Sequence, residues 1–187
     1  MKSKKTLIIL ALALAVLIAG ASVLYKILGQ AIDAEQLAAQ ETQETEHPPV
    51  QAPDFVVVQL DGSEVRLSDH FGKPIVINFW ASWCGPCKME MPDFQEKYLE
   101  LGDEVTFLMV NMTDGSRETV DTASAFIAEQ GYTFPVYYDT ASSAALAYSV
   151  YSLPTTFFID AQGNAIAQAT GAIDAATLQK GIDMIYP

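Results

Sequence analysis

The sequence contains little of what several classes of protein depend on. Two cysteines among 187 residues are too few to staple a small disulfide-rich domain, and by themselves they cannot supply the four ligands of a structural zinc site. Ten Lys and Arg stand against 23 Asp and Glu, which gives a formal net charge of −13. This shortage of cations argues against nucleic-acid binding, because phosphate contacts need clustered Lys and Arg.

The chain is rich in apolar residues, and its charge is unevenly distributed. Half of the residues are hydrophobic and the mean hydropathy is +0.19, so the chain is not disordered throughout and can form a full core. Residues 1–28 carry four lysines and no acid, whereas the other 159 residues carry six basic and 23 acidic side chains, a net charge of −17. A basic, apolar beginning ahead of an acidic remainder is the first indication of location.

The N-terminal segment has the pattern of a membrane anchor. An apolar run from Leu7 to Leu24 is interrupted only by Gly20 and Ser22. Extended to residue 28, it provides about 33 Å of helix, enough to cross a hydrocarbon core of about 30 Å. The lysines before it stay in the cytoplasm under the positive-inside rule. Residues 6–28 therefore predict one transmembrane helix in the cell membrane, with the C-terminal part outside the cytoplasm.

A cleaved signal peptide is the alternative for residues 1–28. Ala19-Gly20-Ala21 has the small-x-small form that a signal peptidase accepts, and cleavage would follow Ala21. Apolar residues continue beyond that position, which favours the uncleaved anchor, and either outcome exports the acidic remainder. Residues 29–51 contain almost no large apolar side chain, which predicts an acidic, flexible linker.

Residues 52–187 alternate between strand and helix patterns. Near-continuous apolar runs predict buried strands, and Asp61-Gly62 is a strong hairpin turn signal. Alternating units of this kind predict an α/β domain with a central sheet and helices on both faces. The predicted elements are a hairpin over 54–60 and 65–67, strands over 75–80, 105–110, 134–138, 155–159 and 165–170, and helices over 84–101, 117–130, 141–148 and 174–185.

The chemistry is concentrated in residues 80–87, the sequence WASWCGPC, where a buried strand is followed by a helix. Cys84 and Cys87 are neighbours on the first helical turn, so their sulfurs can close a small disulfide ring. Free N–H groups and the helix dipole stabilise a thiolate at Cys84. We therefore expect Cys84 to be an exposed nucleophile and Cys87 to be the resolving thiol. Gly85 lets a substrate backbone approach, and Pro86 fits a position without an N–H donor.

Spacing alone leaves other uses of this pair open. The two cysteines could be half of a zinc site shared between chains, or a purely structural disulfide. The flanking tryptophans, the intervening Gly-Pro, the strand before and the helix after favour a redox pair with no metal.

These residues resemble the active-site segment of thioredoxin-fold proteins. Over about residues 52–187 the chain is similar, in particular, to the membrane-anchored, extracytoplasmic TlpA/ResA-like thiol–disulfide oxidoreductases. The resemblance implies a thioredoxin-like fold, with a central mixed β-sheet flanked by helices, an N-terminal β-hairpin and a central αβ insertion around residues 114–145. The matching segments are APDF at 52–55, LDG at 60–62, GKP at 72–74, FWASWCGPCK at 79–88, FPV at 134–136, LPTTFFID at 153–160 and Gly163.

The resemblance also implies a substrate-binding surface. Leu153-Pro154 matches the family's cis-proline loop, in which the backbone of Leu153 would be free to pair with a substrate strand next to Cys84. Without such a match an X-Pro bond has only about a 5–6% chance of being cis. The other members of the predicted substrate-binding set are Trp83, Gly85 and Pro86.

A proton acceptor follows from the same resemblance. Thioredoxin proper has a buried aspartate six residues before the first cysteine, and Asn78 occupies that position here. The TlpA/ResA-like branch has instead a glutamate three residues after the second cysteine, which Glu90 matches. The offset of three keeps Glu90 on the same side of the helix as Cys87, where burial would raise its pKa and suit it to accept the thiol proton. The alternative is an exposed acid on an acidic surface.

The function that the resemblance implies is the reduction of disulfides in exported proteins, such as apocytochrome c, with no cofactor beyond the cysteine pair. A reductant outside the cytoplasm needs a supply of electrons, and an integral-membrane thiol carrier would provide them. The alternatives are a disulfide oxidase or isomerase and a non-catalytic thioredoxin-fold scaffold module. A peroxiredoxin is the nearest other enzyme, but its peroxidatic cysteine stands alone in a different sequence context.

If residues 6–28 anchor the chain, the protein remains in the membrane fraction after high-salt and carbonate washing, because an apolar helix of this length does not leave the bilayer. Immunoblotting of washed membranes measures this. A mature protein that begins at Ser22, as read by N-terminal sequencing, would contradict the anchor and leave export intact.

Overall fold

The computed structural model describes residues 50–186, so the predicted anchor and most of the predicted linker lie outside the described residues. Between residues 50 and 186, no helix is long and apolar enough to cross a membrane. The elements are β1 (Val56–Val58), β2 (Glu64–Arg66), the 3-10 helix η1 (Leu67–His70), β3 (Ile75–Trp80), α2 (Gly85–Leu101), β4 (Thr106–Asn111), α3 (Val120–Gln130), β5 (Val136–Tyr138), α4 (Ser143–Ala147), β6 (Thr155–Ile159), β7 (Ala165–Thr170) and α5 (Ala175–Ile185).

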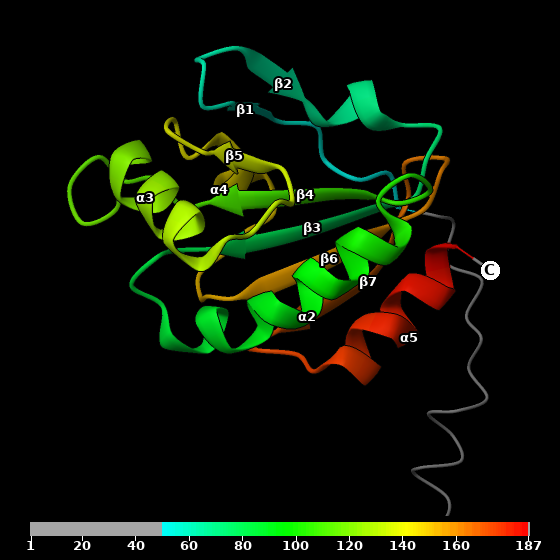
Figure 1. Ribbon diagram of the computed structural model, residues 1–187. Helices are drawn as coiled ribbons and strands as arrows, with labels where there is room; N and C mark the ends of the chain where they lie inside the picture. The colour runs from blue at the N-terminus through cyan, green and yellow to red at the C-terminus, as the bar shows by residue number, and fades with distance from the viewer. Residues whose placement is uncertain (1–49, 187) are drawn as a thin grey trace, which may run out of the picture. The chain divides into compact units, whose positions relative to one another are not determined.

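A seven-stranded mixed sheet has the order β2-β1-β5-β4-β3-β6-β7 (Figure 1). β3 is parallel to β4 and antiparallel to β6, and β4 is parallel to β5. The β1–β2 hairpin extends this sheet through one residue pair, Val58 opposite Tyr138. All six residues of β3 are buried, as its continuous apolar sequence predicts for an inner strand. The predicted mixed sheet and the predicted hairpin are confirmed.

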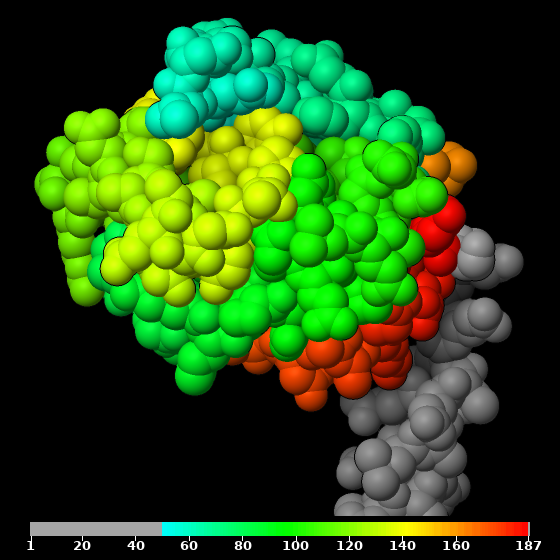
Figure 2. Space-filling view, viewed as in Figure 1, coloured from blue at the N-terminus to red at the C-terminus, as the bar shows by residue number. Residues whose placement is uncertain are grey.

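The two faces of the sheet have separate apolar layers. Ile77 and Phe79 pack with residues of α4 and of the segments around the hairpin, whereas Val76 and Trp80 pack with residues of α2, α3 and α5. Figure 2 shows α2 (green) and α5 (red) side by side on this second face. Successive side chains of a strand point to opposite faces, so β3 contributes to both layers. Helices cover both faces, as predicted.

The largest difference from the predicted helices is at the beginning of α3. The pattern over 117–130 predicts a helix from Arg117, but α3 begins at Val120. The Asp114 carboxylate accepts hydrogen bonds from the N–H groups of Ser116 and Glu118, at 2.7 and 3.0 Å, which holds this segment as a loop. Such local side-chain bonds compete with helix formation. The loop then ends at Thr119, which caps α3.

Folded structure is already present at the end of the predicted linker. The Val50 carbonyl accepts from the Ala165 N–H at 2.9 Å, and Gln51 forms an isolated bridge with Asn164. The neighbouring Gly163 has φ +85°, and a Cβ there would lie 2.8 Å from the Gln51 side chain. Glycine is therefore required where the chain enters the domain.

Candidate active site

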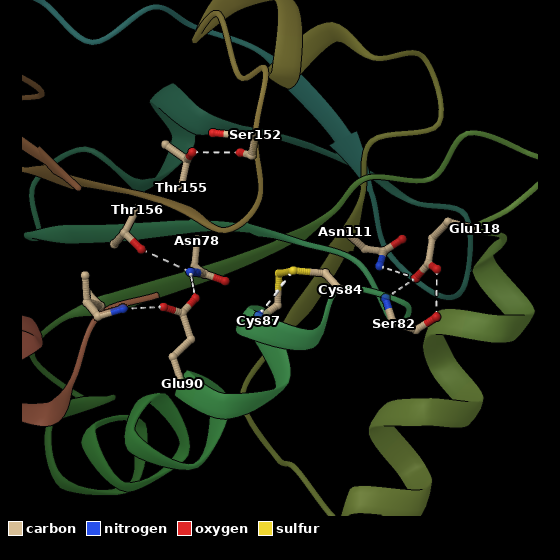
Figure 3. Close-up of a disulfide and its surroundings, with 11 residues drawn as sticks. Asn78, Ser82, Cys84, Cys87, Glu90, Asn111, Glu118, Ser152, Thr155 and Thr156 are labelled. Atoms are coloured by element: carbon tan, nitrogen blue, oxygen red, sulfur yellow. Dashed lines mark hydrogen bonds between the residues drawn. A yellow bond between two sulfur atoms is a disulfide. The ribbon is translucent and has the colours of Figure 1, made fainter. Parts of the chain in front are cut away.

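The cysteine pair lies where β3 leads into α2 (Figure 3). Cys84 and Cys87 are joined by a disulfide, with 5.3 Å between their Cα atoms. Cys84 is the N-cap of α2, and its Sγ accepts a hydrogen bond from the Cys87 N–H at 3.2 Å. A donated N–H and the positive end of the helix both favour a thiolate at Cys84 after reduction.

The accessibility of Cys84 differs from the expectation. Cys84 is 4% exposed and Cys87 is fully buried, so the prediction of an exposed Cys84 is wrong for the disulfide form. The reason is that Cys84 packs in the same apolar cluster as Trp80 and Ala81. Cys84 is nevertheless the more accessible of the two cysteines. The next two residues, Gly85 and Pro86, are exposed.

Glu90 is buried one turn further along α2, with 1% of its surface exposed, so the alternative of an exposed acid is wrong. Its Oε1 accepts from Asn78 Nδ2 at 2.8 Å, and its Oε2 accepts from the Ile173 N–H at 2.9 Å. Burial raises the pKa of Glu90 to about 7, against the opposing effect of these hydrogen bonds, and the charge of Asp93 raises it further. A carboxyl group with this pKa can hold or release a proton near neutral pH.

Asn78 lies on β3, opposite Thr156 of β6. Its Nδ2 donates to the Thr156 hydroxyl at 3.0 Å as well as to Glu90. Asn78 itself is fully buried, and within residues 50–186 its Oδ1 has no hydrogen-bond partner. Strand β3 and the segment before α5 thus each place one donor on the Glu90 carboxylate, and β6 places the Thr156 hydroxyl on Asn78.

The loop before β6 has the form that the resemblance implies. The Leu153–Pro154 peptide bond is cis, and the Pro154 carbonyl accepts from the Gly171 N–H at 2.9 Å. Neither the N–H nor the carbonyl of Leu153 is hydrogen-bonded within the described part of the chain. This backbone is therefore available to an added strand.

A pocket lies between the cysteine motif and this loop. Its walls are mainly apolar, and Tyr151 on its rim is 92% exposed. A concave apolar surface with one free backbone edge can accept an extended peptide. The lining residues are Trp83, Met112, Asp114, Val150, Tyr151, Ser152 and Leu153.

Glu118 is a structural member of the site that the sequence analysis missed. It is fully buried, and its Oε1 accepts from the Ser82 N–H at 2.8 Å and from Asn111 Nδ2 at 2.7 Å. Its Oε2 accepts from the Ser82 hydroxyl at 2.7 Å (Figure 3). Glu118 thereby fixes the position of Ser82, which lies two residues before Cys84. The sequence has no signal for this burial, because Glu118 precedes α3 in a polar stretch.

The residue before Glu118 contacts the same motif. The Arg117 guanidinium lies over the Trp83 ring, 3.7 Å from its centroid, in a cation–π contact. Arg117 and Trp83 are both exposed, so the contact covers part of the rim of the pocket. Two consecutive residues of the 114–119 loop therefore hold two consecutive residues of the cysteine motif.

Comparison with known proteins identifies the family. A family model described as the AhpC/TSA family matches residues 49–168. The chain belongs to the AhpC/TSA family. Among curated relatives, the thiol-disulfide oxidoreductase ResA of Geobacillus kaustophilus is 38% identical over 137 residues, which cover 73% of this chain and 76% of the relative. ResA of Oceanobacillus iheyensis is 37% identical over 140 residues, which cover 73% of this chain and 71% of the relative.

Solved structures agree with this assignment. StoA from Bacillus subtilis matches with a TM-score of 0.60 and 27% identity, over 71% of this chain and 98% of StoA. A thiol:disulfide interchange protein of the thioredoxin family from Chlorobium tepidum matches with a TM-score of 0.65 and 26% identity, over 75% of this chain and 99% of that protein. The predicted thioredoxin-like fold is confirmed, and the AhpC/TSA family member described here is a thiol–disulfide oxidoreductase.

Replacement of Glu118 by Ala should destabilise the disulfide form of this oxidoreductase. The Ser82 N–H and Asn111 Nδ2 lose their buried acceptor, and a buried group without a partner costs about 1–3 kcal/mol. Urea unfolding measures this change in the free energy of unfolding. Glu129→Ala, on the exposed side of α3, is the matched control and should change it by less than about 0.5 kcal/mol. Equal effects of the two variants would contradict the structural role of Glu118.

Proposed function

We propose that this oxidoreductase is a membrane-anchored reductase of disulfides in exported proteins. The observation that carries the proposal is the buried Glu90 carboxyl group, one helical turn from the buried Cys87. Reduction of a substrate requires Cys87 to lose a proton in a place where charge is disfavoured. A group beside it with a pKa of about 7 is suited to accept that proton.

The reaction has two exchange steps. In the dithiol form, the Cys84 thiolate attacks one sulfur of the substrate disulfide, and the other substrate sulfur leaves as a thiolate. Cys87 then transfers its proton to Glu90 and attacks Cys84 Sγ. This forms the Cys84–Cys87 disulfide and releases the second substrate sulfur as a thiolate. Two electrons pass from the cysteine pair to the substrate, and no other cofactor is required.

The substrate would bind as an extended segment beside the disulfide. The free backbone groups of Leu153 offer one strand-like pairing site, and the apolar pocket offers space for a neighbouring side chain. Trp83, Gly85 and Pro86 would border the same segment, since they flank Cys84 in the sequence. Backbone pairing gives affinity without requiring one particular sequence, which suits an enzyme that acts on disulfides in unfolded chains.

The compartment and the electron supply complete the proposal. The apolar segment 6–28 and the three lysines that precede it support a single anchor with residues 52–187 outside the cytoplasm. Disulfides form and persist in such compartments, so a reductase there needs electrons from across the membrane. An integral-membrane thiol carrier is the proposed donor, and apocytochrome c is the proposed representative of the exported substrates. The similarity to ResA proteins supports a thiol–disulfide exchange role but names no substrate.

Reduction of insulin by the reduced protein should be abolished in Cys84→Ser, because the alcohol does not attack a disulfide. Turbidity of the precipitating insulin chains measures the rate. Cys87→Ala should still form the first mixed disulfide and fail to release it, so exported proteins should be recovered covalently attached to Cys84. Loss of the activity in Cys84→Ser would exclude a non-catalytic scaffold, whereas a wild-type protein that does not reduce insulin would support it. A reduction potential as oxidising as that of DsbA, about −120 mV, would favour an oxidase instead.

Glu90→Gln should slow the release of the mixed disulfide and change its pH dependence between about pH 5 and 9. In the wild type, the rate should rise as Glu90 loses its proton near pH 7, and Gln lacks that titration. The measurement is the pH–rate profile of disulfide reduction for both proteins. Glu96→Gln, exposed on the same helix, is the control and should follow the wild type. Superimposed profiles of Glu90→Gln and the wild type would mean that the proton goes to water.

A stability measurement tests the same pKa independently of catalysis. Because folding raises the pKa of Glu90, its contribution to stability is full below about pH 4.5 and is lost as the pH rises through about 7. Urea unfolding of the disulfide form should show this decline for the wild type. Glu90→Gln should remove this component of the decline, whereas Glu96→Gln should retain it.

A further inference from the structure

The side-chain carbonyl of Asn78 is an unused acceptor inside the protein. Asn78 is fully buried, and its amide nitrogen donates to both Glu90 and Thr156. Its Oδ1 is inaccessible to solvent and has no partner within residues 50–186. A buried acceptor without a donor is unfavourable, so a native protein that keeps one calls for a physical explanation.

The orientation of the amide gives that explanation. Val76, Asn78 and Trp80 point to the same face of the sheet, because every second residue of a strand does so. The side chains of Val76 and Trp80 pack in the same apolar cluster as Cys87. In Figure 3 the nitrogen of the amide points to Glu90, while its oxygen points toward the disulfide. The Asn78 side-chain amide therefore lies between Glu90 and Cys87, with its nitrogen toward Glu90 and its oxygen toward the disulfide.

We propose that Asn78 is a positioning residue for the resolving step, and that its Oδ1 accepts a hydrogen bond from the Cys87 thiol in the reduced protein. In the disulfide, Cys87 Sγ carries no hydrogen, so Oδ1 has nothing to accept. Reduction adds two electrons and two protons to the pair and creates a buried S–H donor at Cys87. Asn78 Oδ1, which is unpaired in the disulfide form, thus gains the Cys87 S–H as a donor in the reduced form. This inference rests on the proposed function only for the role of Cys87 as the resolving thiol.

The same amide connects Cys87 to Glu90 through both protonation states. Before the transfer, the Cys87 S–H donates to Oδ1 and Nδ2 donates to the Glu90 carboxylate. The proton then leaves Sγ and is bound at Oε1 of Glu90. A half-turn of the amide would present Nδ2 to the new thiolate and Oδ1 to the new Glu90 O–H. The Thr156 hydroxyl is compatible with both orientations, because it can accept from Nδ2 or donate to Oδ1.

The surroundings of Glu90 contain few other charges that would disturb this exchange. On α2, Asp93 acts on Glu90 and raises its pKa. Strands β3 and β6 contribute Asn78 and Thr156, which do not titrate, and the segment before α5 contributes the Ile173 N–H. The Ile173 N–H bonds to Oε2, so it stays in place whether or not Oε1 carries the proton.

The first test is the equilibrium of the full-length protein with a glutathione redox buffer at pH 7. Asn78→Leu removes the acceptor that only the reduced form uses, so the equilibrium should move toward the disulfide by roughly fivefold, the effect of one net hydrogen bond. Thr156→Val is the matched control, because it removes a partner of Asn78 that is present in both redox states, and it should leave the equilibrium unchanged. A purely structural role of Asn78 would destabilise both forms equally and also leave the equilibrium unchanged, which would overturn the proposal.

The second test uses the wild type and applies even if Asn78→Leu does not fold. The side-chain carbonyl carbon of Asn78 should shift in the NMR spectrum on reduction, since its oxygen gains a hydrogen bond. Asn111 is the internal control, because it is equally buried and its Oδ1 already accepts from the Thr113 hydroxyl at 2.8 Å. An Asn78 resonance that moves no more than that of Asn111 would overturn the proposal. Neither test involves a protein substrate, so failure here is distinct from failure of the proposed reductase activity.

Discussion

The proposed mechanism depends on one constraint: the Cys87 thiol must lose its proton in a place that water does not reach. Cys87 is fully buried, and a thiolate there is unfavourable without compensation. In the proposed mechanism Glu90 takes up this proton, and its burial suits it to do so, since an exposed carboxylate has too low a pKa to hold a proton near neutrality. The burial of both groups is therefore part of the chemistry, although it is also what makes each of them costly to ionise.

The sheet topology assembles this environment from distant parts of the chain. Adjacent strands β3 and β6 bring Asn78 and Thr156 together across 78 residues of sequence, and the segment before α5 brings Ile173 to Glu90 across 83. An active-site helix alone would place Cys87 and Glu90 on one side but would give Glu90 no partners. The fold thus supplies the hydrogen bonds that moderate the effect of burial on the Glu90 pKa.

The sequence predicts local features better than long-range ones. β3, β6 and β7 have their predicted bounds, since apolar runs and turn residues are local signals. The family resemblance, together with the spacing from Cys87, predicts the burial of Glu90. Its contact with Ile173 is not predicted, because no local pattern specifies which loop reaches a helix. Glu118 is missed for the same reason: its partners lie 36 residues earlier and on β4. The late start of α3 reflects a side-chain turn at Asp114 that competes with a favourable helical pattern.

The contacts of Arg117 and Glu118 have a consequence for protein engineering. The WASWCGPC sequence is not expected to keep its geometry when it is transferred alone to another protein. A loop about 35 residues further along the chain supports the backbone at Ser82 and the ring of Trp83. A graft of these eight residues onto a thioredoxin scaffold without the 114–119 loop would carry both cysteines but lose this support. In this protein the motif and the loop therefore depend on each other, and a minimal redox module has to include both.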